Sequence, residues 1–215
     1  MNSSIADLRK NYTLTGLSEA DVDDNPIKQF QIWFQQALDA DLLEPNAMTL
    51  ATATADGKPS ARIVLLKGVS ENGFVFYTNY QSQKGKQLIA NPYCALVFLW
   101  KELERQVRIE GKVEQLSPQE SDAYFHSRPK ASQLGALASA QSRVIVSRQV
   151  LDRKLVDLQT QYQNDATIPR PEHWGGFKVI PNIIEFWQGR PSRLHDRLVY
   201  NLQDDRSWQI SRLAP

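Results

Sequence analysis

The sequence has little that could form cross-links, and neither sign of charge is in excess. It contains one cysteine, Cys94, which excludes an intrachain disulfide. Cys94 lies in the apolar run YCALVFLW with no adjoining base to stabilise a thiolate, so we expect a buried side chain and no nucleophile. The chain has 25 basic and 24 acidic residues, and this balance argues against a general nucleic-acid-binding protein.

Long apolar runs are also missing. No stretch approaches the length of a membrane span, and the N-terminal residues MNSSIADLRKNYTLTGL lack the apolar core of a secretory signal. We therefore expect no membrane association and a cytoplasmic location. Apolar residues make up 41% and charged residues 23% of the 215, which is typical of a soluble globular domain with a substantial core.

Several common catalytic motifs do not occur. The sequence has no glycine-rich phosphate loop, no nucleophile elbow and no Cys/His cluster with metal-site spacing, so we expect no metal. Histidines number only three: His126, His173 and His195. Any anion-binding site must therefore come from local clusters of cations.

The first regular pattern is helical. Ile27, Phe30, Phe34 and Leu38 recur at helical spacing, and Asn25 is a suitable N-cap before a proline. These residues predict an amphipathic helix whose aromatic stripe faces the core.

Strand patterns follow. Three strand-like runs occupy 47–79, separated by ADGKP and SENG, and two more occupy 93–116 after a short helix in SQKGKQLIANP. Two or three helices over 118–163 open with the capping sequence SPQE, and the tail gives four strands: GGFKVI, IIEFWQG, SRLHDRLVYN and SWQISRL. This order predicts an α+β, mainly β fold, an antiparallel barrel with flanking helices. The polar first 20 residues are interpreted as an arm.

Two segments in the first half combine cations with groups suited to phosphate. RIVLLK has Arg62 and Lys67 at its ends, although strand parity puts them on opposite faces. In YTNYQSQKGKQ, Lys84 opens a helix, and a helix N-terminus offers free N–H groups to an anion. Strand-end charges that reach water and simple capping by Ser82 explain these segments equally well.

Two more such segments lie in the second half. In YFHSRPKASQLGA, Tyr124 and Arg128 share a helix face, and Ser132 can cap the next helix. If RPSRLHDR is a strand, Arg193, His195 and Arg197 share one face and need an anion over them. Surface ion pairs and a solvated strand face are the competing explanations, and a strand tryptophan such as Trp187 usually packs in the core.

Taken in this order, the segments resemble the FMN-dependent pyridoxine (pyridoxamine) 5′-phosphate oxidases. The matching text is RIVLLK, VFYTN, SQKGKQ, LERQVRIEGK, YFHSRP, SQLGA, WGGF, IEFWQG, RLHDR and ISRLAP. It runs from about residue 9 to the end. The combination of IEFWQG, RLHDR and ISRLAP is specific to these oxidases, whereas general split-barrel flavoproteins share the fold without that tail.

The resemblance implies an FMN-binding split barrel and a homodimer with FMN at the subunit interface. Residues 1–20 correspond to a mobile N-terminal arm, and 21–215 to a single domain that includes the C-terminal dimerisation and substrate segment. Pyridoxine or pyridoxamine 5′-phosphate gives a hydride from C4′ to flavin N5. Oxygen then reoxidises the flavin to yield hydrogen peroxide, with ammonia released from the amine and pyridoxal 5′-phosphate as product.

The resemblance also assigns roles to residues. The cofactor-binding residues are Arg62, Ile63, Val64, Leu65, Leu66, Lys67, Tyr77, Thr78, Gln83, Lys84, Gln106, Gln141, Ser142, Trp187 and Arg197. The substrate-binding residues are Arg9, Tyr12, Lys67, Tyr124, Arg128, Ser132, Arg193, Leu194 and His195. The catalytic residues are Arg193 and His195.

One position departs from the family pattern. Gln83 stands where the family usually has an arginine. A charge-assisted hydrogen bond contributes roughly 1.5–3 kcal/mol, so we expect a shifted FMN affinity and no loss of the cofactor.

Two other functions fit the same barrel. A non-catalytic carrier of flavin or pyridoxal phosphate has no need for Arg193 and His195 beside the flavin. An NAD(P)H-dependent flavin reductase is bleached by a nicotinamide in the absence of air, whereas the oxidase is bleached by pyridoxine 5′-phosphate.

Overall fold

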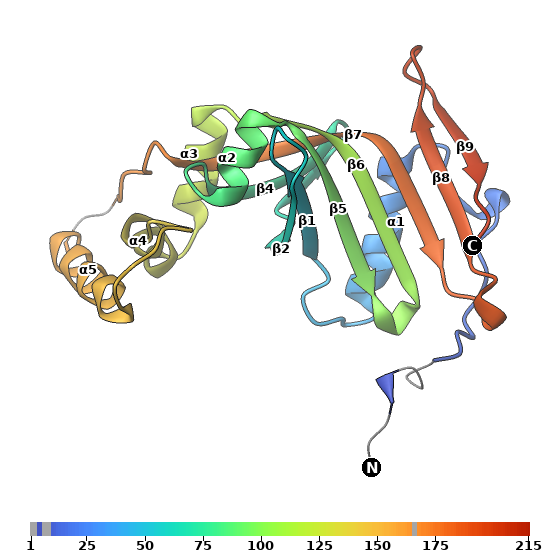
Figure 1. The fold of residues 1–215 in the computed structure, drawn as a ribbon, viewed down its shortest axis with the longest axis horizontal. Helices are drawn as coiled ribbons and strands as arrows, with labels where there is room; N and C mark the ends of the chain where they lie inside the picture. Colours follow the sequence, from blue (N-terminus) through green and yellow to red (C-terminus); the bar gives the residue numbers. More distant parts are fainter. Residues whose placement is uncertain (1–3, 6–9, 165–166) are drawn as a thin grey trace.

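A nine-stranded antiparallel sheet forms the centre of the molecule (Figure 1). The computed structural model describes residues 4–5, 10–164 and 167–215, so the predicted substrate residue Arg9 lies outside the described residues. The strands are β1 (Ala47–Ala53), β2 (Pro59–Leu65), β3 (Gly68–Ser70), β4 (Gly73–Asn79), β5 (Tyr93–Trp100), β6 (Arg105–Gln115), β7 (Trp174–Gln188), β8 (Asp196–Leu202) and β9 (Trp208–Arg212).

The two ends of the sheet are joined by a short connection. The strand order is β2-β1-β5-β6-β7-β4-β3, and β2 and β3 at the two ends are separated in the chain by only two residues. The Lys67 N–H donates to the Val75 carbonyl at 2.8 Å and extends the β3–β4 ladder to this junction. The hairpin β8–β9 branches from β7. The predicted mainly β, antiparallel barrel with flanking helices is confirmed.

Strand β7 differs from the prediction of two separate strands, because it runs unbroken for 15 residues. Strand β6 pairs along one edge, while β4 and then β8 pair along the other. The β6–β7 register shifts between Glu110 and Gly111, opposite Pro181, and a bulge is where a strand accepts proline. A Cβ on Gly111 would lie 2.2 Å from the Ile180 carbonyl oxygen, so this close approach requires glycine.

Helix α1 (Pro26–Asp39) packs against the sheet and contributes side chains to the main hydrophobic core. Asn25 caps it as predicted, and its side chain accepts two N–H groups of the first turn. Phe30 packs edge-on against Phe74 with ring centroids 4.9 Å apart, and Trp33 packs against the ring of Phe186. Leu38, expected in the stripe, is instead 47% exposed, since the buried face turns toward Trp33.

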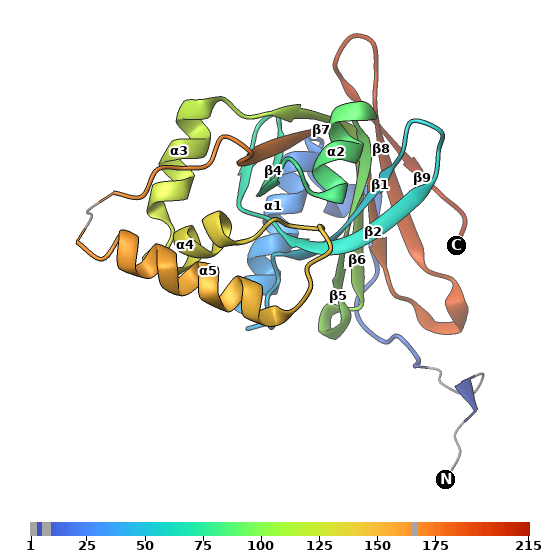
Figure 2. The same ribbon diagram turned by 60° about the vertical axis from the view of Figure 1, so that its left-hand side comes forward.

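The other helices lie on one side of the molecule (Figure 2). They are α2 (Gln83–Ala90), α3 (Pro118–Ser127), α4 (Lys130–Ala138) and α5 (Arg148–Gln161). Helices α2 and α3 contact the sheet, and α5 packs on α4. A second core of Phe125, Leu134, Ile168 and Trp174 joins α3 and α4 to the start of β7. The predicted capping box at Ser117 is present, but Ser132 lies within α4, whose N-cap is Pro129.

Cys94 is buried, and burial raises the pKa of its thiol to about 12, so it stays protonated at neutral pH. None of the helices in the described ranges combines the length and apolarity that crossing a membrane requires.

Candidate active site

A cavity of about 500 Å³ opens between β2, β4 and the helices α2, α3 and α4. Its lining residues are Ile63, Val64, Leu65, Lys67, Tyr77, Thr78, Asn79, Lys84, Tyr124, Arg128, Pro129, Ser132, Gln141 and Trp174. Three of them are cations, and no carboxylate lines the cavity among the residues described. Such a surface attracts an anion.

Lys84 carries one of these charges in an unfavourable place. Its side chain is 8% exposed, and its ammonium lies 3.4 Å from the hydroxyl of Thr78. Burial lowers the pKa of Lys84, and the charge of Arg62 lowers it further. Ser82 does cap α2 through the Gly85 N–H, so the capping explanation is confirmed, and it does not exclude an anion beside Lys84.

Arg62 lies beside the cavity and is held by neutral groups only. Its guanidinium donates to the hydroxyls of Thr52 at 2.6 Å and Ser60 at 2.8 Å. The buried amide oxygen of Gln87 accepts from both hydroxyls and fixes their orientation. Burial lowers the pKa of Arg62, and its hydrogen bonds within the described residues are to a carbonyl, two hydroxyls and an amide oxygen, none of them a carboxylate.

Arg128 closes the other side of the cavity. It is the C-cap of α3, and its guanidinium carbon lies 4.7 Å from the ring centroid of Trp174. Its Nη1 is buried without a hydrogen-bond partner among the described residues, and burial lowers the pKa of Arg128. Buried donors nearly always have an acceptor, so this atom indicates a missing oxygen. A phosphate satisfies that requirement.

An aromatic stack supports Arg128. The rings of Tyr77 and Tyr124 stack with centroids 3.8 Å apart, and Trp174 lies parallel to Tyr77 at 5.5 Å. The sequence analysis did not identify Trp174 as a site residue, although WGGF is one of the matching motifs. A tryptophan at the start of a strand does not indicate which cation its ring contacts. Asn79 and Pro129 were also missed.

Three predicted cofactor residues lie in one row across the sheet. Gln106 pairs with Trp187, and Trp187 pairs with Arg197, so their side chains share one face of β6, β7 and β8. Arg197 binds the buried carboxylate of Glu185 through two hydrogen bonds of 2.8 and 3.1 Å. This carboxylate, which the sequence analysis did not single out, also accepts from Arg108.

A second cavity of about 830 Å³ lies at the β7–β8 connection. Its lining residues are Lys10, Asn11, Tyr12, Arg190, Ser192, Arg193 and His195. The prediction of a continuous strand here is wrong: residues 191–193 form a 3-10 turn and β8 begins at Asp196. Ser192 and Arg193 have φ of 58° and 62°, so strand parity does not apply to them. Leu194 is exposed and does not line the cavity.

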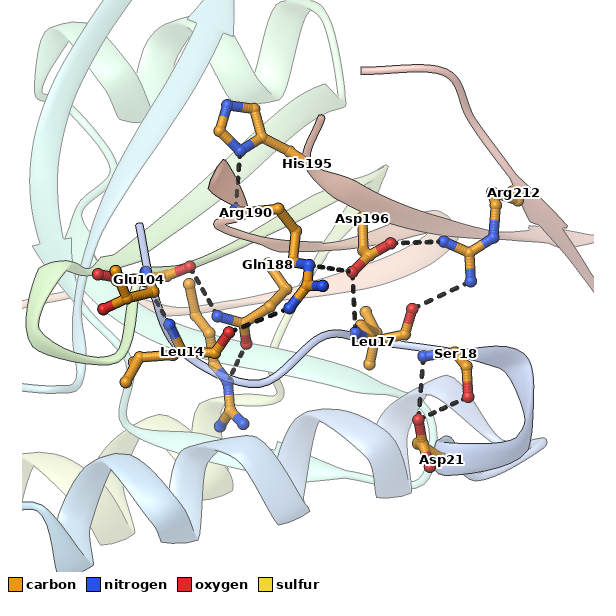
Figure 3. Close-up of polar contacts among 12 residues, drawn as sticks. Leu14, Leu17, Ser18, Asp21, Glu104, Gln188, Arg190, His195, Asp196 and Arg212 are labelled. Carbon is orange, nitrogen blue, oxygen red and sulfur yellow. Dashed lines mark hydrogen bonds and ion pairs between the residues drawn. The ribbon is translucent and has the colours of Figure 1, made fainter. Parts of the chain in front are cut away.

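His195 has a defined proton position. Its Nδ1 accepts the Arg190 backbone N–H at 3.1 Å (Figure 3), so a neutral ring carries its proton on Nε2. Burial lowers the pKa of His195, the charge of Arg193 lowers it further, and Asp196 opposes both. The ring lies 4.6 Å from that of Trp187, and Tyr12 contacts both rings edge-on.

The two cavities lie at opposite ends of β7. Trp174, its first residue, lines the smaller cavity, and the larger one follows its last residue, a path of about 45 Å at the usual rise of a strand. The predicted residues therefore divide into two groups within one chain. Leu66 is buried, and Gln83 and Ser142 are exposed, so these three line neither cavity.

Comparison with known proteins identifies the family. Residues 34–162 match the family described as pyridoxamine 5′-phosphate oxidase, and 174–215 match the pyridoxine 5′-phosphate oxidase C-terminal dimerisation region. The chain belongs to the pyridoxamine 5′-phosphate oxidase family. The pyridoxine/pyridoxamine 5′-phosphate oxidase of Gloeothece citriformis, another member of this family, is 64% identical over 215 residues, all of both chains.

Solved structures agree with the family's fold. PhzG from Burkholderia lata, in complex with tetrahydrophenazine-1-carboxylic acid, has a TM-score of 0.89 and 29% identity, covering 96% of this chain and 100% of that one. A pyridoxamine 5′-phosphate oxidase-related, FMN-binding protein from Nostoc punctiforme has a TM-score of 0.69 at 17% identity, covering 86% and 97%. The barrel is therefore the split barrel of this family.

Proposed function

We propose that the protein oxidises pyridoxine 5′-phosphate and pyridoxamine 5′-phosphate to pyridoxal 5′-phosphate with bound FMN. The observation that carries this proposal is the orphaned Nη1 of Arg128 in a cavity with three cations and no carboxylate among the described residues. Lys67, Tyr124, Arg128 and Ser132, predicted to hold the substrate phosphate, all line this one cavity. Membership of the family supplies the substrate class.

The residues present fit FMN. Arg62 and Lys84 offer uncompensated positive charge to its phosphate beside the N-terminus of α2, and Thr78 and Gln141 add polar groups. When bound, FMN supplies the redox chemistry, taking a hydride from C4′ and passing two electrons to O₂ to give hydrogen peroxide. Gln83 is exposed at the start of α2, consistent with a modest effect on affinity.

The complete site requires two copies of the chain. The smaller cavity holds the predicted phosphate ligands, whereas Arg193, His195 and the row containing Trp187 lie at the far end of β7. A homodimer with two-fold symmetry brings the far end of one β7 to the cavity of the partner. The dimerisation region over 174–215 includes both ends of that strand. FMN then lies at the subunit interface.

Within that site the protein positions the substrate and provides charge. His195 offers its Nε2–H as a hydrogen-bond donor, because Nδ1 is already occupied. Arg193 lies beside the reacting carbon, where its guanidinium donates hydrogen bonds and orients the pyridine ring against the cofactor. Glu185 holds Arg197 toward the cofactor. The N-terminal arm over 1–20, of which residues 1–3 and 6–9 lie outside the described residues, belongs to the same proposal. So do the single domain over 21–215 and the cytoplasmic location.

The direct test is the purified protein itself. We expect a yellow flavin spectrum that bleaches with pyridoxine 5′-phosphate without air, and hydrogen peroxide in equal amount to pyridoxal 5′-phosphate in air. Bleaching by NADH or NADPH and not by the phosphorylated pyridoxine would identify a flavin reductase. Bound flavin with neither response would identify a carrier.

The role of Trp174 gives a further prediction. Replacing Trp174→Leu removes the ring beneath Arg128, a cation–π contact of about 1–2 kcal/mol when desolvated. We expect the KM for pyridoxine 5′-phosphate to rise about tenfold with kcat little changed, measured by initial rates. Trp174→Phe keeps an aromatic face and should show a smaller rise. Equal KM values for the two variants would contradict the role of the ring.

A further inference from the structure

Glu104 is a buried carboxylate at an unusual backbone position. It follows a 3-10 turn at residues 101–103 and precedes β6. Its φ is 53°, in the left-handed region that residues other than glycine seldom adopt. Its side chain is 4% exposed. A glutamate is rarely buried unless it is paired, so its partners indicate what the position is for.

The partners of the Glu104 side chain lie in the N-terminal segment. Its Oε2 accepts the backbone N–H groups of Thr13 at 2.9 Å and Leu14 at 3.1 Å. The ammonium of Lys10 lies 3.9 Å from Oε1. We call residues 10–17 the N-terminal strap. The two N–H donors make charge-assisted hydrogen bonds to this buried carboxylate, whereas the exposed Lys10 ammonium lies beyond hydrogen-bond distance and contributes little.

The carbonyl of Glu104 holds a different segment. It accepts the Gly189 N–H at 2.7 Å and a side-chain N–H of Gln188 at 3.2 Å (Figure 3). These residues end β7 and begin the loop that carries Arg193 and His195. Glu104 thus connects both walls of the larger cavity, the strap on one side and the loop on the other.

Other contacts fasten the strap to the same loop (Figure 3). Arg190 donates to the Leu14 carbonyl at 3.2 Å, and Asp196 accepts the Leu17 N–H at 3.0 Å. Asp196 is itself bound by Arg212 at 2.8 Å. Among the hydrogen bonds that fasten the described part of the strap, the one from the Thr13 N–H to Glu104 lies nearest to Tyr12, one residue along the chain.

Tyr12 is the strap residue that this anchoring places. Its ring lies 5.6 Å from those of both Trp187 and His195. A Cβ on Gly189 would lie 2.6 Å from Tyr12 Cγ, so the absence of a side chain there leaves room for the ring. Glu104 holds the backbone directly after this ring, through the N–H groups of Thr13 and Leu14.

We propose that Glu104 is a positioning residue that clamps the N-terminal strap and so holds Tyr12 over the substrate side of the active site. Its effect on activity rests on the proposed function, because the loop it serves carries Arg193 and His195. Its effect on the strap does not, since the contacts belong to the chain alone. Glu104 itself lines neither cavity. It contacts the lining residue Lys10, and it acts on Tyr12 and on the loop through the backbone N–H groups of Thr13, Leu14 and Gly189.

The experiment compares Glu104→Ala, Glu104→Gln and Glu102→Gln in the full-length flavin-loaded protein. Glu102 is an exposed carboxylate in the same turn and serves as the matched control. The first readout is the rate of tryptic cleavage after Lys10, followed by mass spectrometry. We expect Glu104→Ala to accelerate cleavage about tenfold or more, with a smaller increase for Glu104→Gln, which keeps an acceptor oxygen.

The second readout is steady-state kinetics with pyridoxine 5′-phosphate. We expect Glu104→Ala to raise KM about tenfold while flavin content and kcat remain close to wild type, with partial rescue by Glu104→Gln. Unchanged cleavage and KM in a folded Glu104→Ala protein would overturn the proposal. If Glu104→Ala does not fold, Thr13→Pro is the alternative, because proline removes the N–H that donates to Glu104 from the exposed strap. It must give the same faster cleavage and the same rise in KM.

The two readouts separate this inference from the proposed function. A wild-type protein without oxidase activity would refute the function, while faster cleavage in Glu104→Ala would still support the clamp. Activity in the wild type with cleavage unchanged in both Glu104→Ala and Thr13→Pro would refute the clamp alone.

Discussion

Dimers that combine Arg128→Leu chains with Arg193→Leu chains should recover activity that neither variant has alone. Each change removes a cation from every site of its own homodimer, and we expect a loss of about a hundredfold or more in kcat/KM. In a mixed dimer, one site receives both lesions and the other receives none. Random pairing makes half of the dimers mixed, so the co-expressed pair should reach about a quarter of wild-type activity.

The control for this experiment pairs two lesions on the same segment. When Arg193→Leu chains are co-expressed with His195→Ala chains, every site of a mixed dimer receives a loop that carries one of the two changes. No recovery of activity is therefore expected. The measurement is the peroxide rate per flavin after co-expression and purification. Absence of recovery in the Arg128 and Arg193 pair would mean that one chain supplies a complete site, against the arrangement of the two cavities.

The second large effect concerns Lys84, whose replacement should change stability and flavin binding in opposite directions. Burial lowers the pKa of Lys84, so the folded, flavin-free protein disfavours its charged form at neutral pH. Lys84→Met removes this penalty, and the flavin-free variant should melt at a higher temperature than flavin-free wild type. Losing the charge–phosphate contact, about 1.5–3 kcal/mol, should weaken FMN binding roughly 10- to 100-fold.

Lys86→Met provides the matched comparison, because Lys86 is an exposed residue of the same helix, α2. It should leave both the melting temperature and the FMN affinity close to wild type. Thermal melts with and without FMN, together with a fluorescence titration of flavin, give both quantities. A lower melting temperature for flavin-free Lys84→Met would show that the ammonium stabilises the fold, and it would contradict a role of this charge in binding an anion.

Many residues that the resemblance assigns to the site line the smaller cavity, because they lie in short motifs. RIVLLK, YTN and YFHSRP each place adjacent side chains on one strand end or helix end, so spacing and resemblance agree with the lining of the smaller cavity. Helix starts at Asn25 and Ser117 were equally predictable, since capping chemistry depends on residues within one turn.

The loop at 190–195 could not be predicted in the same way. Alternating residues there suggested a strand, but Ser192 and Arg193 adopt positive φ. Glycine is typical of that conformation, whereas serine and arginine give no indication of it in a sequence. Glu104 and Trp174 were missed for a different reason. Their significance depends on partners 91 and 46 positions away, Thr13 and Arg128, and no local pattern records such a pairing.

The unbroken strand β7 also restricts how this chain can change over evolutionary time. Trp174 and Trp187 stand near its two ends, and only the number of intervening residues sets their separation and the side to which each points. Inserting or deleting a single amino acid between them would turn the side chains of one end to the opposite face of the sheet, which would displace the proposed phosphate ligands or the loop. Residue identities along β7 are therefore free to drift where the core permits, while its length is not.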